Sequence, residues 1–321
     1  MPCTLLQREK YNMNIDNKTV WEGLPEGLVD SISKRLPLLS VVSMGDACAT
    51  WREVLASETP PSQTRGLPWL MLCGQNDSKK TSCLSVLQNN VWEMEVPEAC
   101  GKYFWGSFQD WLIVVERCQS NVIEICFLNP FLNAKIQLPR TFDIFSKIVL
   151  SASPTDRDCV TLLLTEYGSW IWCWTPGAKA WCRRSLRIDD VVFCNGSFYF
   201  VNPENDVLIL NAKCVINAMK EENSGCGIPS QCHKVDMPNR SSWCGLRLRR
   251  YLVESCGEVL LVCRLFERFN GEFRETRTFE VFKLDVTGMV WVKMESLGDR
   301  ILFIGKCDSK SFSSKELGLD R

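Results

Sequence analysis

The chain has 321 residues, 45% of them hydrophobic, which is enough to bury a substantial core and excludes a largely disordered protein. Its 37 lysine and arginine residues balance 38 aspartate and glutamate residues. Because no overall field draws it to nucleic acid or to a membrane surface, we expect neither as a partner and look instead for a protein or a small molecule.

The N-terminal sequence MPCTLLQREKYNMN has charges where a signal peptide would need its apolar core. The longest apolar runs, WLIVV and VLLVC, are too short to span a bilayer. We therefore expect an intracellular protein with a disordered segment at 1–19. Its eighteen cysteines lie mostly in apolar, strand-like runs, so we expect them to be reduced and buried as small hydrophobes.

Residues 20–57 are predicted to be helical. Pro25 suits the first turn of a helix. Apolar residues then recur every four positions and predict one apolar face, made of Leu24, Leu28, Ile32 and Leu36. The stretch MGDACATWREVL predicts a second helix with the apolar face Met44, Ala47, Cys48, Trp51 and Leu55. We expect a third short helix between the two, and a linker over residues 58–66, which contain prolines and polar residues.

From residue 67 the pattern changes to alternating strands and closely spaced turns, which is typical of an antiparallel β domain. The predicted hairpins join SCLSVL to VWEMEV, WLIVVE to VIEICFL, VTLLLT to WIWCW, and FEVFKLD to MVWVKME. The clearest is DVVFC-NG-SFYFV. There the pair Asn195 and Gly196 can adopt the positive φ angles that a two-residue turn needs.

A weak internal repeat runs through this half. Strand-like units begin at Val91, Ala134, Ala180, His233 and Val290, and their starts are 43, 46, 53 and 57 residues apart. These spacings are near the period of a propeller blade with loop insertions. The fold class predicted for the whole chain is α+β multidomain, with a small three-helix module at 20–57 and an all-β propeller of about six blades at 67–321.

Two further points concern this β domain. The alternative architecture is a β-sandwich or an irregular all-β domain. If the propeller closes by pairing its ends, the segments 67–73 and 301–307 should share a blade or lie in adjacent ones.

Several of these segments resemble a known family. Residues 24–55 resemble an F-box in the Leu24-Pro25 opening, the apolar positions that follow and the Cys48-x-x-Trp51-Arg52 ending. The segments NPFLNAKIQLP, DDVVFCNGSFYFV and LGDRILFIGKCDSKSFSSKELGL resemble the β-propeller that follows the F-box in a large group of plant proteins, sometimes labelled F-box/kelch-repeat.

The sequence departs from that family in two places. Asp46 stands where family members usually carry a small apolar residue, which would lower adaptor affinity. The family usually continues beyond position 321 into another strand-forming segment, which implies a last blade that is incomplete or closed differently.

The resemblance implies a non-catalytic substrate-recognition subunit of an SCF-type (Skp-cullin-F-box) ubiquitin ligase in the nucleus and cytoplasm. The F-box would bind a Skp-type adaptor, and through it cullin and RING subunits, while the propeller would bind a target protein for ubiquitination. The residues expected at the adaptor are Leu24, Pro25, Leu28, Ile32, Leu36, Cys48, Trp51 and Arg52. For each of them the alternative is a place in the module's own core, above all for Ile32 and Trp51.

Catalytic and metal-binding patterns are scarce. There is one histidine, and the sequence contains no G-x-S-x-G, no phosphate-binding glycine loop and no H-E-x-x-H. The residues Cys226, Cys232, His233 and Cys244 lack the paired C-x-x-C spacing of structural zinc sites, so we interpret them as part of a loop. We therefore expect no cofactor and no metal.

The basic run Arg247, Arg249 and Arg250, near Trp243, allows two interpretations. It could be a patch for an acidic partner or nucleic acid, or a solvated charged strand edge, which the balanced net charge favours. Two other functions also stay open. One is a propeller scaffold without productive cullin assembly, and the other is a propeller enzyme acting on a small molecule or carbohydrate, which would need clustered acidic residues at the central channel.

Overall fold

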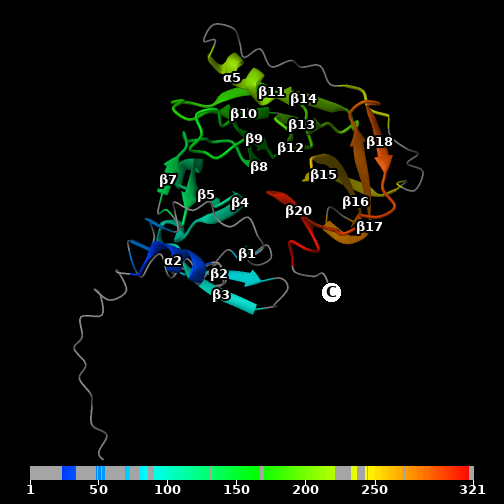
Figure 1. Ribbon diagram of the computed structural model, residues 1–321. Coiled ribbons are helices and arrows are strands. Elements are labelled where there is room, and N and C mark those ends of the chain that lie inside the picture. The colour runs from blue at the N-terminus through cyan, green and yellow to red at the C-terminus, as the bar shows by residue number, and fades with distance from the viewer. Residues whose placement is uncertain are drawn as a thin grey trace, which may run out of the picture. The chain divides into compact units, whose positions relative to one another are not determined.

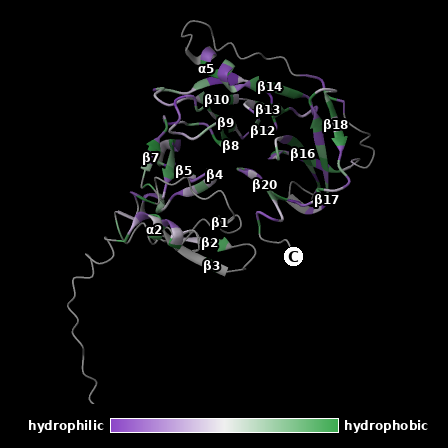
Figure 2. Ribbon diagram, in the orientation of Figure 1, coloured by the Kyte–Doolittle hydropathy of each residue, from purple (hydrophilic) through white to green (hydrophobic). Residues whose placement is uncertain are grey.

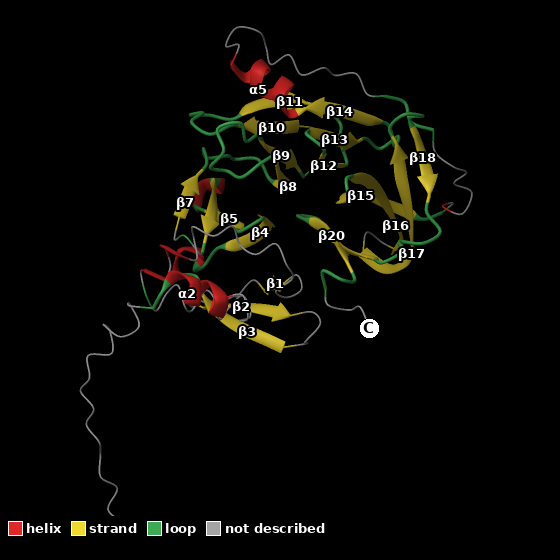
Figure 3. Cartoon of the chain, viewed as in Figure 1, coloured by secondary structure: helices red, strands yellow, loops and turns green. Residues whose placement is uncertain are grey.

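The computed structural model describes residues 24–33, 48, 50, 51, 53, 54, 69–72, 80–85, 90–130, 132, 134–166, 170–220, 233–236, 243, 245–269 and 272–317. The chain divides into two compact units, Met1–Arg65 and Gly66–Arg321. Strands make up most of the described elements (Figure 3). The predicted segments 1–19 and 58–66 lie outside the described residues.

Unit 1 contains helix α2 (Glu26–Ser33). Its first turn forms as the proline predicts, because the carbonyl of Pro25 accepts hydrogen bonds from the N–H groups of Leu28 (2.8 Å) and Val29 (3.2 Å). Glu26 adds a negative charge at the positive end of the helix dipole. Within the second predicted helix, residues 50, 51, 53 and 54 are helical. The third predicted helix falls outside the described residues.

Unit 2 consists of antiparallel sheets that follow one another along the chain (Figure 1). The described strands form six of them, which we call sheets A to F. Sheet A contains β1 (Trp69–Leu72), β2 (Lys80–Ser85) and β3 (Asn90–Glu95). Sheet B contains β4 (Tyr103–Phe108), β5 (Trp111–Arg117), β6 (Ile123–Asn129) and β7 (Ala134–Gln137). Sheet C contains β8 (Phe145–Leu150), β9 (Thr161–Thr165), β10 (Trp170–Trp174) and β11 (Cys182–Ser185).

The second half of unit 2 continues in the same way. Sheet D contains β12 (Asp190–Cys194), β13 (Ser197–Val201) and β14 (Val207–Asn211). Sheet E contains β15 (Arg247–Ser255), β16 (Glu258–Phe269), β17 (Glu272–Asp285) and β18 (Val290–Lys293). Sheet F contains β19 (Arg300–Ile304) and β20 (Ser309–Ser313). The remaining helical elements are the helix α5 (Ala212–Lys220) and two short 3-10 turns, η1 (Pro97–Ala99) and η2 (Gln119–Asn121).

The predicted hairpins and the internal repeat both have clear counterparts in these sheets. Each predicted strand pair forms an antiparallel ladder. The repeat units that begin at Val91, Ala134, Ala180 and Val290 overlap β3, β7, β11 and β18, which are the last strands of sheets A, B, C and E. The unit at His233 adds a single bridge to Val207 of sheet D. The repeat therefore marks the outermost strand of each sheet.

The first strands of sheets B to E, together with β20 of sheet F, make the contacts expected at the centre of a propeller. β4 contacts β8, β8 contacts β12, β12 contacts β15, and β15 contacts β20. Two hydrogen bonds join β20 back to β4: the N–H of Ser107 donates to Asp308 Oδ2 (3.3 Å), and Lys310 Nζ donates to the carbonyl of Ser107 (3.0 Å). The sheets are propeller-like in this respect, and a sandwich of two large sheets is excluded for the described strands.

Hydrophobic cores lie between consecutive sheets, so strands such as β9 bury both faces. Leu163 packs into the core shared by sheets B and C, whereas its neighbours Leu162 and Leu164 pack into the core shared by sheets C and D. A continuous apolar run is what such a strand needs, because successive side chains point to opposite faces. Figure 2 shows hydrophobic residues (green) along β14 and β18, and hydrophilic ones (purple) on α5.

Tryptophans also join neighbouring sheets. Trp291 of sheet E is fully buried, and its indole N–H donates to the carbonyl of Asn205 (2.9 Å), in the loop before β14 of sheet D. The indole N–H of Trp105, on β4, donates to the carbonyl of Ser146 on β8 (3.2 Å). These bonds satisfy the polar end of each indole while the ring fills the core. Trp170 is an exception, since it is exposed.

The Asn195-Gly196 turn forms as predicted. Both residues have positive φ angles, 47° and 78°, and the flanking residues of β12 and β13 pair in register. The turn also contacts the next sheet, since Asn195 Nδ2 donates to the carbonyl of Gly257 (2.8 Å) in the β15–β16 turn. That second turn has positive φ angles at Cys256 and Gly257 as well.

Three other expectations have mixed outcomes. The segments 67–73 and 301–307 contribute strands to different sheets, A and F, and no ladder among the described strands joins them. That they lie in the same blade or in adjacent blades stays a prediction. The thiols of Cys48, Cys126, Cys159 and Cys194 are free and buried as expected, but Cys214 and Cys256 are exposed. No helix in the described part of the chain is long and apolar enough to cross a membrane.

Candidate functional site

The first candidate site is the apolar side of α2. Leu28 is 51% exposed and Ile32 is 40% exposed, and their four-residue spacing places them side by side on the helix. Their neighbour Val29 is buried at 1% exposure and takes the core position instead. Ile32 is thus more exposed than a core residue, and its place at the adaptor stays a prediction.

The other residues predicted at the adaptor differ in how exposed their side chains are. Pro25 is exposed, and Leu24 and Trp51 are half-buried. Cys48 is buried, which suits the core better than a contact surface. Leu36 and Arg52 lie outside the described residues.

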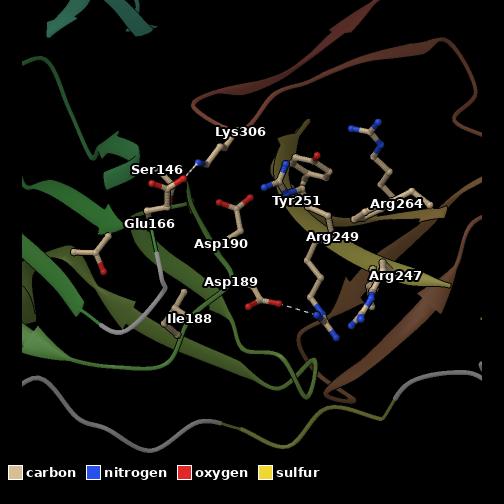
Figure 4. A pocket seen from close by; sticks show the side chains of 14 residues that line it. Ser146, Glu166, Ile188, Asp189, Asp190, Arg247, Arg249, Tyr251, Arg264 and Lys306 are labelled. Atoms are coloured by element: carbon tan, nitrogen blue, oxygen red, sulfur yellow. Dashed lines mark hydrogen bonds and ion pairs between the residues drawn. The ribbon is translucent and has the colours of Figure 1, made fainter. Parts of the chain in front are cut away.

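The second candidate site is a cavity of about 770 Å³ in unit 2. Ser146, Asp190 and Arg247 line it from the beginnings of β8, β12 and β15, the first strands of sheets C, D and E. Each of these strands starts at the same end of its sheet, so the cavity opens at one end of the central strands. The other lining residues are Thr165, Glu166, Ile188, Asp189, Leu248, Arg249, Arg250, Tyr251, Arg264, Phe266 and Lys306 (Figure 4).

Two ion pairs bridge sheets at this cavity. Arg250 Nη1 lies 2.7 Å from Asp189 Oδ2, and Arg250 Nε donates to Asn205 Oδ1 (2.6 Å). A further bond from Arg250 reaches the carbonyl of Pro203. These contacts make Arg250 a connection between sheets D and E rather than a solvated residue. On the other side, Lys306 pairs with Glu166.

One of the lining residues, Asp190 of β12, forms a buried ion pair with Lys147 of β8. Both oxygens of Asp190 accept bonds from Lys147 Nζ (2.9 and 3.1 Å), and they also accept the backbone N–H groups of Val191 (2.8 Å) and Leu252 (2.7 Å). Burial raises the pKa of Asp190 above its usual range, and the Lys147 ammonium and the backbone donors oppose that shift. Three sheets therefore meet at one carboxylate.

Arg247 and Arg249 differ from Arg250. Both are exposed into the cavity, and within the described residues neither forms an ion pair. Figure 4 shows them with Arg264 on the side of the cavity away from Glu166 and Ser146. For Arg247 and Arg249 this agrees with the interpretation of the basic run as a solvated strand edge, since β15 is an edge strand of sheet E and both side chains are exposed, and the same two residues line the cavity.

The sequence contained weak signals for the Lys147–Asp190 pair. Lys147 stands inside the apolar run FSKIVL, and a lysine in a buried strand almost always has a partner. Its partner is the second aspartate of the DDVVFC segment, 43 residues away. Nothing in the local pattern could identify that partner among the other carboxylates, so the pair was not predicted.

The cavity does not resemble a general acid-base site. Glu166, Asp189 and Asp190 are each bonded to a cation, so none of the carboxylates that line it among the described residues is free. The described residues also contain no group of three or more His, Cys, Asp or Glu side chains placed to hold a metal ion. Cys226, Cys232 and Cys244 lie outside the described residues.

A comparison with protein families gives a match over residues 83–321 to the family described as the KIB1-4 beta-propeller. This stretch includes all of sheets B to F. The chain belongs to the KIB1-4 beta-propeller family. The predicted resemblance to a family-specific plant propeller is thereby confirmed.

Relatives of this KIB1-4 propeller chain extend the likeness into unit 1. The F-box/kelch-repeat protein At1g57790 of Arabidopsis thaliana is 25% identical over 322 residues, covering 94% of this chain and 82% of the relative. The F-box protein At3g56470 of the same plant is 22% identical over 324 residues, covering 97% of this chain and 77% of the relative. Among solved structures, the N-terminal domain of Nup159 aligns with a TM-score of 0.40 and 7% identity, covering 74% of this chain and 64% of that one.

Proposed function

We propose that this protein is the substrate-recognition subunit of an SCF-type ubiquitin ligase. In this proposal the N-terminal residues 20–57 form an F-box that binds a Skp-type adaptor, and through it cullin and RING subunits. The propeller domain at 67–321 holds the target protein. Such a ligase would act in the nucleus and cytoplasm.

The observation that carries the proposal is the exposure of Leu28 and Ile32 on α2. An amphipathic helix binds a groove through apolar anchors at i and i+4, and these two residues have that spacing and are accessible. The relatives that match nearly the whole chain are F-box proteins, which supports the same role for this segment. Of the six other residues of the predicted set, Leu24, Pro25 and Trp51 would extend the contact.

We also infer that sheets B to F are blades of one propeller, with β4, β8, β12, β15 and β20 around the centre. The contacts between these strands and the shared cores of consecutive sheets support this arrangement. A propeller of this kind presents loops at its ends, where recognition residues can vary without disturbing the cores. The adaptor and the target would then bind to different parts of the chain.

The test is an affinity purification of tagged full-length protein from plant cells, followed by detection of the adaptor and the cullin. The variant Leu28→Lys/Ile32→Lys should lose the adaptor, because it places two charges where the proposed complex would bury apolar side chains. Gly27→Lys is the matched control, since position 27 is on the same helix and a side chain there meets no atom within 4 Å.

Retention of both proteins by the wild type and by Gly27→Lys, with loss in the double variant, supports the proposal. Absence of adaptor and cullin from the wild-type purification would contradict it and would favour a propeller scaffold that does not assemble with a cullin. Equal retention by the double variant would show that α2 is not the contact surface.

A further inference from the structure

The large cavity has one wall made of arginines. We call Arg247 and Arg249 of β15, with Arg264 of β16, the arginine wall. Arg249 and Arg264 are direct partners in the β15–β16 ladder, and Arg247 is the partner of Phe266. Residues that are opposite each other, or two apart on one strand, share a face of the sheet. Three guanidinium groups therefore stand on one face of sheet E (Figure 4).

The carboxylates that line the cavity do not neutralise Arg247 and Arg249. Glu166, Asp189 and Asp190 are bonded to Lys306, Arg250 and Lys147, respectively. Within the described residues, Arg247 and Arg249 form no ion pair, so both guanidinium groups can take an anion. Arg264 is held in place, since its Nε donates to Thr276 Oγ1 (2.9 Å).

Apolar side chains also line the cavity. Ile188, Leu248 and Phe266 are among its lining residues. A ligand that reaches the arginine wall can therefore also contact apolar groups.

We propose that this cavity binds a protein segment in which acidic or phosphorylated side chains lie next to an apolar residue. Guanidinium groups bind carboxylate and phosphate in the same bidentate manner, so both anions have the required chemistry. The cavity, about 770 Å³, is large enough for several side chains. The proposal rests on the proposed function in one respect only, that the segment belongs to the target of the ligase.

A nucleic acid fits these observations less well. The whole chain has a net charge of −1, whereas a surface that follows a phosphate backbone is usually strongly basic. Glu166 and Asp189 also face the cavity and would repel a continuous polyanion. A short anionic segment can meet the arginine wall while its apolar neighbour contacts the apolar residues that line the cavity.

The proposal can be tested by fluorescence anisotropy with the purified full-length chain. The probes are three labelled peptides that share a leucine and differ before it, carrying glutamates and aspartates, phosphoserines, or uncharged serines and glutamines. Arg249→Gln should weaken binding of the charged peptides roughly tenfold, and Arg247→Gln/Arg249→Gln should weaken it further. Arg157→Gln, at an exposed arginine in the β8–β9 connection that does not line the cavity, is the matched control and should bind as the wild type does.

Two further measurements make the result specific. Arg249→Gln should not lower the melting temperature, because Arg249 is exposed and forms no ion pair within the described residues, so lost binding would not reflect unfolding. Comparison of the carboxylate and phosphate peptides then identifies the anion.

The proposal is overturned if the uncharged peptide binds as well as the charged ones, or if the double variant binds them unchanged. It is also overturned if a single-stranded DNA oligonucleotide displaces the peptides and depends on the same arginines. Peptide binding and adaptor retention are separate readouts. If the peptides do not bind the cavity, the result of the adaptor purification with Leu28→Lys/Ile32→Lys is unaffected. If the adaptor is not retained, the result of the peptide-binding measurement is unaffected.

Discussion

Lys147 Nζ lies 2.9 Å from Asp190 Oδ1, and the two side chains are only 5% and 7% exposed. The pair joins the first strands of sheets C and D, and a bond from the N–H of Leu252 to Asp190 Oδ2 adds the first strand of sheet E. A buried pair of this kind contributes little net stability compared with apolar residues, but it is costly to break, because the remaining charge stays buried. Its main consequence is to set how the three sheets meet.

The first prediction is that Asp190→Asn destabilises the protein by about 3 to 5 kcal/mol, because Lys147 would be left as an unpaired buried cation. Adding Lys147→Met should recover most of the loss, since the asparagine oxygen can still accept a backbone N–H and no charge remains. Urea unfolding of the single and double variants measures this. Glu204→Gln, which breaks the exposed pair with Arg187, serves as the control and should cost less than about 1 kcal/mol. A double variant less stable than the single one would contradict this account.

The second prediction concerns thiol chemistry. Burial, and to a lesser degree the Glu254 carboxylate, raises the pKa of Cys194 to about 11. Because the thiolate is the reactive form, iodoacetamide should label the exposed Cys214 and Cys256 in the native protein well before Cys194. Mass spectrometry of time points gives the order. Labelling of Cys194 at the rate of Cys256 would show that the β12 end is open to solvent.

The same pKa shift predicts a dependence of stability on pH. The pKa of the Cys194 thiol is about 11 in the folded protein, whereas the thiol of the unfolded chain has its ordinary pKa of 9.0. The folded state therefore binds more protons between these values, and the free energy of unfolding should fall as pH rises through that window. Cys194→Ser should show a shallower fall, measured by urea titrations across that range.

The fourth prediction concerns the turn between β12 and β13. Gly196 has a φ of 78°, which is unfavourable for alanine, so Gly196→Ala should destabilise the protein by at least about 1 kcal/mol. Gly27→Ala is the control, because position 27 is helical and open, and it should be neutral or slightly stabilising. Thermal melts of both variants decide the point. Equal melting temperatures would mean that the turn adopts another conformation in solution.

The fifth prediction tests the core between sheets D and E. Trp291 is fully buried and donates to Asn205, so Trp291→Ala should cost about 3 to 5 kcal/mol through the cavity that it leaves. Its neighbour Val292 points away from this core and is exposed, so Val292→Ala should cost less than about 1 kcal/mol. Denaturant unfolding of the two variants gives the comparison. Similar losses would show that the two faces of β18 are equally buried.

The hairpins and the repeat were predictable from the sequence because they depend on neighbours along the chain. Asn195-Gly196 specifies a tight turn through its own φ angles, and the apolar runs on either side supply strands of matching length. The units at Val91, Ala134, Ala180 and Val290 recur because each sheet ends in the same kind of outer strand. The family resemblance came from such local segments too.

What the sequence alone determined is therefore the β character of the large unit, its turns, its outer strands and its likeness to plant F-box proteins. The tertiary structure decided which side chains of these segments are free. Leu28 and Ile32 follow the same spacing as a buried stripe, yet Val29 takes the core position on α2. In the basic run, Arg250 is bonded to sheet D whereas Arg249 faces the cavity. Periodicity specifies the relative orientation of side chains within one element, but only packing against distant strands determines which face is covered and which charges find a partner.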